Sequence, residues 1–205
     1  MKIIFGTTSK RKVEDLQNIC SQLDIKVEIL SLDDIGWDLG EIDENGSTVE
    51  ENSLIKANAV HEFCVSHNIN YPIITDDAGM FCEALNGEPG VYTARYGDDE
   101  LALDPSLPKH QCVLKLLRKL NGTSNRKAYY KCAVTCMMPD GSYFQELGKS
   151  DGSISEKMPN ELKKPYFFSV FILDGTNCPF ADLEPDELIG TYRYNAMEKT
   201  LKKIK

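Results

Sequence analysis

The apolar positions along the chain fall into short runs and helically spaced sets, which predict an alternation of strands and helices. The short runs predict strands at about 2–5, 27–30, 72–75, 129–138, 142–148 and 166–173. The helically spaced sets predict helices at about 10–23, 49–66, 107–120 and 191–203. Mixed strands and helices indicate an α/β fold with some antiparallel pairing.

The segments between these elements predict how they are connected. Segment 33–47 is acidic and holds three glycines, so it is expected to be a loop. Pro139-Asp140-Gly141 separates two predicted strands, which indicates a hairpin. The chain has no internal repeat and no low-complexity linker, and its 205 residues fit one large domain, so we expect a single domain over residues 1–205.

The composition limits the kinds of partner. Hydrophobic residues make up 41% and charged residues 27%, the balance of a globular protein. The net charge of −9 argues against a nucleic acid polymer as partner, because phosphate-backbone contacts need a basic surface. A single nucleotide is not excluded, because it needs only a few local cations, backbone N–H groups and a metal ion.

The same sequence predicts a cytoplasmic protein. No apolar run reaches about 18 residues, so no transmembrane helix is expected. The run Ile3-Ile4-Phe5 is too short for a signal peptide. The seven cysteines form no CxxC pair, and Cys132 and Cys136 would share a strand face with Val134. We therefore expect reduced thiols that pack in the core rather than a metal or redox site.

The first candidate for chemistry is the turn from the first predicted strand into the first predicted helix. Thr7 and Ser9 lie in the turn, and Lys10, Arg11 and Lys12 lie in the first helical turn. A helix N-terminus offers free N–H groups and positive potential, which suit a phosphate. The cations oppose the helix dipole, and a bound anion would explain them. The alternative is that Ser9 is a simple N-cap and the cations are solvated.

The second candidate is the start of the helix at 49–66. Thr48 followed by Glu51 is the pattern of a capping box, which would account for both residues. The functional alternative makes Glu51 a metal ligand. Lys56 lies one turn beyond Asn52 and could reach a phosphate on the same side of the helix.

The third candidate is the pair Asp76-Asp77 at the predicted end of the strand at 72–75. Two adjacent carboxylates are costly there unless they face water or a cation. Mg²⁺ binds a few carboxylates together with substrate phosphate oxygens, and a carboxylate can deprotonate an attacking water. The alternative is an acidic turn, with Gly79 permitting a tight bend after the pair. Taken in order, the three segments suit metal-assisted hydrolysis of a polyphosphate.

Several stretches resemble the signatures of the inosine/xanthosine triphosphate pyrophosphatases of the Ham1 type. The long specific runs are TDDAG (75–79) and ALNGEPGVYTARY (84–96). EENSLIKA (50–57) is similar to the family's helix motif, and FGTTSKRK (5–12) is similar to its N-terminal phosphate motif. The convincing resemblance covers about residues 2–97, and later elements are similar in spacing.

The resemblance implies a fold, a reaction and roles for particular residues. The fold would be an elongated α/β structure with two lobes around a central nucleotide cleft, commonly a homodimer. The reaction would split a nucleoside triphosphate into monophosphate and pyrophosphate with Mg²⁺. Glu51 and Asp77 would be metal-site carboxylates, and Asp77, with Asp76 beside it, would accept the proton of the attacking water. The triphosphate would be held by Thr7, Ser9, Lys12 and Lys56.

The chain departs from the family pattern mainly where the base is recognised. Ser9 stands where Asn is usual, and Ala78 stands where Ser follows the aspartates. The Gly-Phe-Gly-Tyr-Asp-Pro motif aligns with Lys164-Pro165-Tyr166-Phe167-Phe168-Ser169, so its Asp is replaced by Phe168 or Ser169. The Ser-His-Arg group becomes Thr191-Tyr192-Arg193, and the upstream Lys becomes Leu188. By resemblance, Ala78, Phe168 and Arg193 are the counterparts of substrate-binding positions.

These observations favour an active pyrophosphatase for inosine- or xanthosine-type nucleotides. The rival is a nucleotide-binding protein with weak or altered activity: the altered base motif favours it, and the retained Lys12, Lys56, Glu51 and Asp77 oppose it. A polymer nuclease is disfavoured by the net charge of −9. The aromatic residues Phe167 and Phe168 could either stack on a base or belong to the strand core.

Overall fold

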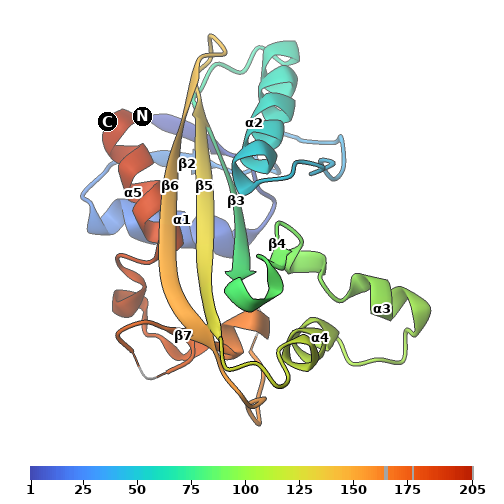
Figure 1. The fold of residues 1–205 in the computed structure, drawn as a ribbon. Helices are drawn as coiled ribbons and strands as arrows, with labels where there is room; N and C mark the ends of the chain where they lie inside the picture. Colours follow the sequence, from blue (N-terminus) through green and yellow to red (C-terminus); the bar gives the residue numbers. More distant parts are fainter. Residues whose placement is uncertain (164–165, 177, 205) are drawn as a thin grey trace. The chain divides into compact units, whose positions relative to one another are not determined.

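The computed structural model describes residues 1–163, 166–176 and 178–204 (Figure 1). The chain divides into two compact units. The first contains Met1–Asp77, Cys132–Gly148 and Tyr192–Lys205, and the second contains Ala78–Lys131 and Lys149–Thr191. Among the described residues, no helix is both long and apolar enough to cross a membrane.

The elements of both units are mixed strands and helices, as the sequence predicts. The strands are β1 (Lys2–Phe5), β2 (Glu28–Leu30), β3 (Ile73–Cys82), β4 (Pro89–Gly90), β5 (Lys127–Met137), β6 (Tyr143–Ile154) and β7 (Phe171–Leu173). The α-helices are α1 (Lys10–Gln22), α2 (Val49–Ser66), α3 (Asp98–Leu103), α4 (Gln111–Lys119) and α5 (Tyr192–Ile204). Short 3₁₀ helices cover Glu83–Leu85, Thr93–Arg95, Tyr166–Ser169, Phe180–Asp182 and Pro185–Leu188.

The first unit is built on strands in the order β2-β1-β3-β5-β6. Strand β1 pairs in parallel with both β2 and β3, with Ile4 opposite Ile73. Because parallel neighbours need a crossover, α1 connects β1 to β2 and α2 precedes β3. Strands β5 and β6 are long neighbours joined by the predicted hairpin turn, where Met138 N donates to Ser142 O at 2.7 Å (Figure 1).

Helix α2 packs on one face of this sheet and buries an apolar cluster of the first unit. The cluster contains Ile4, Leu32, Ala57, Val60, Phe63, Cys64, Ile73 and Met137. Helices α1 and α5 contact each other, as Figure 1 also shows. Helix α1 buries Leu16, Ile19 and Cys20. These apolar contacts fix the helices that carry the charged residues described below.

The second unit contains the remaining part of each of the three long strands: residues 78–82 of β3, 127–131 of β5 and 149–154 of β6. Strand β4 pairs antiparallel with the end of β3, and β7 pairs antiparallel with the end of β6. An aromatic cluster lies in this unit: Phe168 is 5.4 Å from Tyr130 and 4.8 Å from Phe180 between ring centroids, and Phe171 is 4.9 Å from Tyr130.

Four predicted elements are wrong in their extent. The strand predicted at 142–148 runs to Ile154 as β6. Strand β3 does not end before Asp76 but continues to Cys82, and Gly79 makes no turn. A Cβ at Gly79 would overlap the carbonyl group of Gly90 on the paired strand, so this glycine permits close strand packing instead. The helix at 107–120 begins only at Gln111: Pro108 disfavours helix for Leu107 before it, and Lys109 and His110 form a turn.

The predicted strand at 166–173 is replaced by the 3₁₀ helix Tyr166–Ser169 followed by β7. The apolar run did not distinguish a strand from a short buried helix, an ambiguity that short runs always carry. The predicted packing role of the cysteines agrees with the structure. All seven thiols are free, and five are buried, among them Cys132 and Cys136 at 0% exposure.

Candidate active site

The adjacent aspartates of β3 contact different helices. Asp76 contacts Lys12 of α1 and Arg193 of α5, whereas Asp77 contacts Asn52 and Lys56 of α2. Successive side chains of a strand point to opposite faces, so the two carboxylates diverge although they are neighbours in sequence. All of these residues belong to the first unit.

Asp76 is a buried counter-ion shared by two cations. Its carboxylate is 2% exposed and lies 3.0 Å from Lys12 Nζ and 2.8 Å from Arg193 Nη1. Burial acts to raise the pKa of Asp76, but the attraction of Arg193 and Lys12 outweighs it and lowers the pKa well below its usual range. Asp76 is therefore ionised at neutral pH, which makes it a poor proton acceptor and a strong anchor for both cations.

Hydroxyl groups of the turn that precedes α1 accept hydrogen bonds at the N-terminus of this helix. Ser9 Oγ accepts a hydrogen bond from Lys12 N at 3.4 Å, so the N-cap reading of Ser9 is confirmed. Thr7 Oγ1 accepts from Ser9 N at 3.1 Å. The first turn of α1 carries no acidic residue. Binding of a phosphate by Thr7 and Ser9 remains a prediction, and it would place an anion where the dipole and the cations both favour one.

Asp77 and Glu44 share the ammonium group of Lys56. Lys56 Nζ lies 3.0 Å from Glu44 Oε2 and 3.6 Å from Asp77 Oδ1. Burial acts to lower the pKa of Lys56, but the attraction of Asp76, Asp77 and Glu44 outweighs it and raises the pKa. Burial raises the pKa of Asp77, against the influence of Lys56 and Asn52. A raised pKa suits a carboxylate that accepts a proton near neutral pH.

The Glu51 carboxylate is hydrogen-bonded to Ser47, which lies just before α2. Its Oε2 atom accepts hydrogen bonds from Ser47 N at 2.6 Å and from Ser47 Oγ at 2.7 Å. Thr48 Oγ1 accepts from Glu51 N at 3.1 Å, which is one half of the predicted capping box. In the other half of a capping box, Thr48 N would donate to the Glu51 carboxylate. Here the carboxylate accepts from Ser47 N instead. These bonds lower the pKa of Glu51, whose role as a metal ligand stays a prediction.

The donor set of the site fits a small divalent cation. Glu44 and Asp77 already share one positive group, and Mg²⁺ characteristically uses one or two carboxylates together with water and phosphate oxygens. Within the described ranges, no group of three or more His, Cys, Asp or Glu side chains could hold a metal ion unaided. The phosphate oxygens of a substrate would therefore have to complete the coordination.

A buried polar network fixes α2 against the strands beneath the site. Ser53 Oγ lies 2.8 Å from Thr135 Oγ1 and donates to Thr75 O at 3.2 Å, and Thr75 Oγ1 donates to Ser53 O at 2.7 Å. Gln145 Nε2 donates to Thr135 Oγ1 and to Glu50 O, both at 2.9 Å. The network holds the residues before Asp76 and after Glu51 in a fixed register.

The sequence predicts one site that contains Lys12, Lys56, Asp76 and Asp77, and the structure brings Lys12 to Asp76 and Lys56 to Asp77. Two further residues of the site were not predicted. Glu44 lies in the segment predicted only to be an acidic loop, and the signal for its role is a carboxylate near the start of the helix that carries Lys56. Asn52 belongs to the helix motif at 50–57, and its Nδ2 atom donates to Asp77 Oδ2 at 3.2 Å.

The predicted base-reading residues have other partners in the structure. Arg193 pairs with Asp76, and Tyr192 beside it is 4% exposed. Phe168 belongs to the aromatic cluster of the second unit, and Ala78 is the first residue of that unit. Lys164 and Pro165, the start of the aligned base motif, lie outside the described residues.

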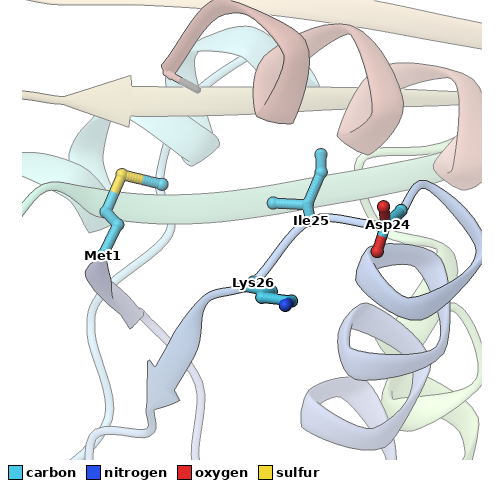
Figure 2. A pocket seen from close by; sticks show the side chains of 4 residues that line it. All are labelled: Met1, Asp24, Ile25 and Lys26. Carbon is cyan, nitrogen blue, oxygen red and sulfur yellow. The ribbon is translucent and has the colours of Figure 1, made fainter.

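A surface pocket of the first unit shares no residue with this charged site. It is lined by Met1, Asp24, Ile25 and Lys26, where the chain passes from the end of α1 toward β2 (Figure 2). Its side chains offer one carboxylate and one ammonium group on an otherwise apolar surface.

The fold and the charged site define a mixed α/β protein with a cluster of lysines and carboxylates suited to an anionic, metal-associated ligand. The chain belongs to the Ham1 family, whose model matches residues 3–203. It is 33% identical over 207 residues to a dITP/XTP pyrophosphatase of Leptospira interrogans, covering 100% of this chain and 97% of that protein.

Other comparisons agree. The chain is 32% identical to a dITP/XTP pyrophosphatase of Leuconostoc mesenteroides, with 91% of this chain and 88% of that protein covered. Its structure resembles that of the Staphylococcus aureus Ham1 protein with a TM-score of 0.81 and 25% identity, covering 100% of this chain and 98% of that one. The family and the mixed α/β fold expected from the sequence are thus confirmed.

Proposed function

We propose that this protein is a Mg²⁺-dependent nucleoside triphosphate pyrophosphatase that converts inosine- or xanthosine-type purine triphosphates, including deoxy forms, to the monophosphate and pyrophosphate. The observation that carries the proposal is the shared contact of Lys56 with Asp77 and Glu44, beside the Lys12–Asp76 pair. Family membership and the names of relatives such as the Leptospira enzyme support the same reaction.

The reaction adds one water across the bond between the α- and β-phosphates. The water oxygen bonds to the phosphorus on one side of the bridge as Asp77 accepts its proton. The bond from that phosphorus to the bridging oxygen breaks, and the bridging oxygen leaves with the other product. Lys12 and Lys56 stabilise the negative charge that develops on phosphate oxygens, in a site where burial strengthens electrostatic interactions. Asp76 holds Lys12 in place, because it stays ionised.

Asp77 would hold Mg²⁺ together with a second carboxylate. Glu51 is the partner predicted from sequence, and the geometry favours Glu44 because it already shares a cation with Asp77. When bound, Mg²⁺ supplies neutralisation of phosphate charge and a more acidic water. In the substrate complex the phosphates and the metal ion would take over the partners that Lys56 and Glu44 have in the free protein.

Further parts of the proposal concern the whole chain. We propose that residues 1–205 act as one functional domain, that the protein forms a homodimer in the cytoplasm, and that it binds no nucleic acid polymer. Multi-angle light scattering tests the dimer, and electrophoretic mobility of an oligonucleotide mixed with the protein tests the last point. The charge of −9 supports the absence of polymer binding.

The decisive experiment is a pyrophosphate-release assay with a panel of triphosphates. Inosine, xanthosine, adenosine, guanosine and modified pyrimidine triphosphates are compared with Mg²⁺ and with chelator, and the Asp77→Asn variant is the control for contaminating enzymes. Mg²⁺-dependent release of pyrophosphate that the variant lacks supports the proposal. Nucleotide binding without turnover would instead support the rival, a nucleotide-binding protein, which the altered base segment favours.

A further inference from the structure

Asn52 is a buried amide that holds two partners on opposite sides. Its Oδ1 atom accepts a hydrogen bond from Gly46 N at 2.8 Å, and its Nδ2 atom donates to Asp77 Oδ2 at 3.2 Å. The residue is 1% exposed and lies in the first turn of α2, next to Glu51. A buried polar side chain with both ends engaged is strongly constrained.

The backbone of Gly46 fixes which way the amide faces. A backbone N–H can only donate, so the oxygen of Asn52 must face Gly46 and the NH₂ group must face Asp77. Gly46 also has to be a glycine for this contact. A Cβ there would lie 2.7 Å from Asn52 Oδ1 and 2.7 Å from Glu51 Cβ.

The amide in turn determines how the Asp77 carboxylate is rotated. Asn52 occupies Oδ2, and the other oxygen, Oδ1, faces Lys56 at 3.6 Å. Without the amide, the carboxylate could rotate about its own bond, and neither oxygen would be held toward Lys56. The same contact joins the loop of Glu44 to α2, because Gly46 lies two residues after Glu44.

We propose that Asn52 is a positioning residue that orients Asp77 so that Oδ1 is presented to the attacking water and to the metal ion. The inference rests on the proposed pyrophosphatase function. Second-layer partners of this kind commonly change metal affinity or activity by 10–100-fold when removed. A misplacement of about 1 Å at a reacting group can cost about 10²-fold in rate.

Two variants separate this role from simple tethering of the loop. Asn52→Leu loses both hydrogen bonds, whereas Asn52→Asp keeps the acceptor for Gly46, loses the donor toward Asp77 and brings a second carboxylate next to that aspartate. The proposal expects kcat to fall by about 10- to 100-fold in both variants, with KM changed by less than about threefold. Asn45→Ala, an exposed change in the same loop, is the matched control and should keep wild-type kcat.

Circular dichroism measures the folded fraction of each variant, and kcat is expressed per folded molecule, so that a folding defect is not counted as a loss of kcat. Loss of kcat in Asn52→Leu alone would show that only the loop tether matters and would overturn the proposal, as would wild-type kcat in both. If Asn52→Leu fails to fold, Asn52→Asp still decides the question, because a wild-type kcat in it overturns the proposal.

A second readout does not depend on turnover. With a non-hydrolysable triphosphate analogue present to complete the coordination, Mn²⁺ binding to the full chain, followed by electron paramagnetic resonance, should be about 10- to 100-fold weaker in Asn52→Leu than in wild type and in Asn45→Ala. Equal Mn²⁺ affinity in all three overturns the proposal. If no triphosphate is hydrolysed by the wild type, the proposed function fails, and the Mn²⁺ comparison alone then decides the role of Asn52.

Discussion

The guanidinium group of Arg193 lies 2.8 Å from the carboxylate of Asp76, although the two residues lie far apart in the chain. Lys12 reaches the same carboxylate at 3.0 Å. One aspartate thereby joins α1, α5 and β3. Because this carboxylate is 2% exposed and the two cations are also largely covered, the cluster contributes to stability as well as to the site.

Asp76→Asn should destabilise the protein by about 3–5 kcal/mol, the usual cost of breaking a buried ion pair from one side. The variant leaves Arg193 and Lys12 without their counter-ion. The measurement is the free energy of unfolding in urea at pH 7. Arg11→Ala is the control, because Arg11 pairs only at the surface, with Asp15. An equal stability of Asp76→Asn and wild type would contradict the structural role.

The same variant should show a specific dependence on pH. The attraction of Arg193 and Lys12 lowers the pKa of Asp76 in the folded state below its ordinary value of about 3.9. The stabilisation is therefore complete above pH about 4 to 5 and is lost as the pH falls through the folded-state pKa. The difference in unfolding free energy between wild type and Asp76→Asn should stay constant from pH 8 to 5 and shrink below pH 4.

Asp77→Asn should abolish hydrolysis while leaving the fold intact. An amide cannot accept the proton and is a poorer Mg²⁺ ligand, so kcat should fall by about 10²-fold or more. Stability should not fall, because burial raises the pKa of Asp77 and its ionised form therefore costs free energy in the folded state above that pKa. Pyrophosphate release and thermal unfolding are measured side by side. Near wild-type turnover would remove Asp77 from the catalytic role.

The two lysines should bind the triphosphate in the ground state, besides stabilising the charge that develops on its phosphate oxygens. Lys12→Ala and Lys56→Ala should each raise KM about 10-fold or more, because each removes a charge-assisted contact with phosphate. Binding of the monophosphate product should change little. A double mutant shows whether both lysines act on one ligand, since coupled residues give non-additive effects. Unaltered triphosphate affinity in both single variants would exclude them from the site.

The local pattern of the sequence was sufficient to predict the helices that carry the lysines of the site. Helix α2 starts and ends where its capping and apolar pattern predicted, so Lys56 could be placed before the structure was known. The N-cap Ser9 also followed from residue type and position. These features depend on contacts within a few residues, which the sequence displays directly.

Long-range contacts could not be predicted in this way. Nothing local shows that β3 continues past Asp77, because its second half is held by pairing with β4. The different partners of Asp76 and Asp77 follow from strand alternation, which is known only once the strand is known to continue. Glu44 lies on a loop whose path depends on the hydrogen bond between Gly46 and Asn52. The contact of Glu44 with Lys56 therefore could not be predicted from the sequence pattern.

Glu44→Gln and Glu51→Gln should separate the two candidate metal ligands. A carboxylate that binds Mg²⁺ raises the Mg²⁺ concentration needed for half-maximal activity when it becomes an amide, by about 10-fold or more. The geometry predicts this effect for Glu44, which shares Lys56 with Asp77. Glu51→Gln should keep most of its capping bonds to Ser47 and shift the Mg²⁺ titration little.

The result for Glu51 is decisive in either direction when stability is measured in parallel. A normal unfolding free energy with a raised Mg²⁺ requirement would assign Glu51 to the metal site, as the family resemblance implied. An unchanged titration would leave it as the cap of α2.

The last prediction concerns the base. A site built around hydrogen bonds to a 6-keto purine rejects analogues that lack the matching groups, because its own polar groups are then left unpaired. Here the residues aligned with such a site are otherwise engaged. Arg193 is paired with Asp76, and Phe168 packs against Tyr130 and Phe180. Withdrawing Arg193 toward a base would weaken the buried pair with Asp76, so little of its binding energy is available to distinguish one base from another.

We therefore expect a weaker preference for inosine triphosphate over adenosine and guanosine triphosphates than dedicated hydrogen bonds would give, or a shifted substrate. Aromatic side chains stack on any base with about 1–3 kcal/mol and little discrimination, so they would not restore the preference. The measurement is kcat/KM for the nucleotide panel under one Mg²⁺ condition, with Tyr92→Phe, an exposed aromatic change, as the control. A preference of several hundredfold or more for inosine or xanthosine would contradict the prediction and would mean that other residues read the base.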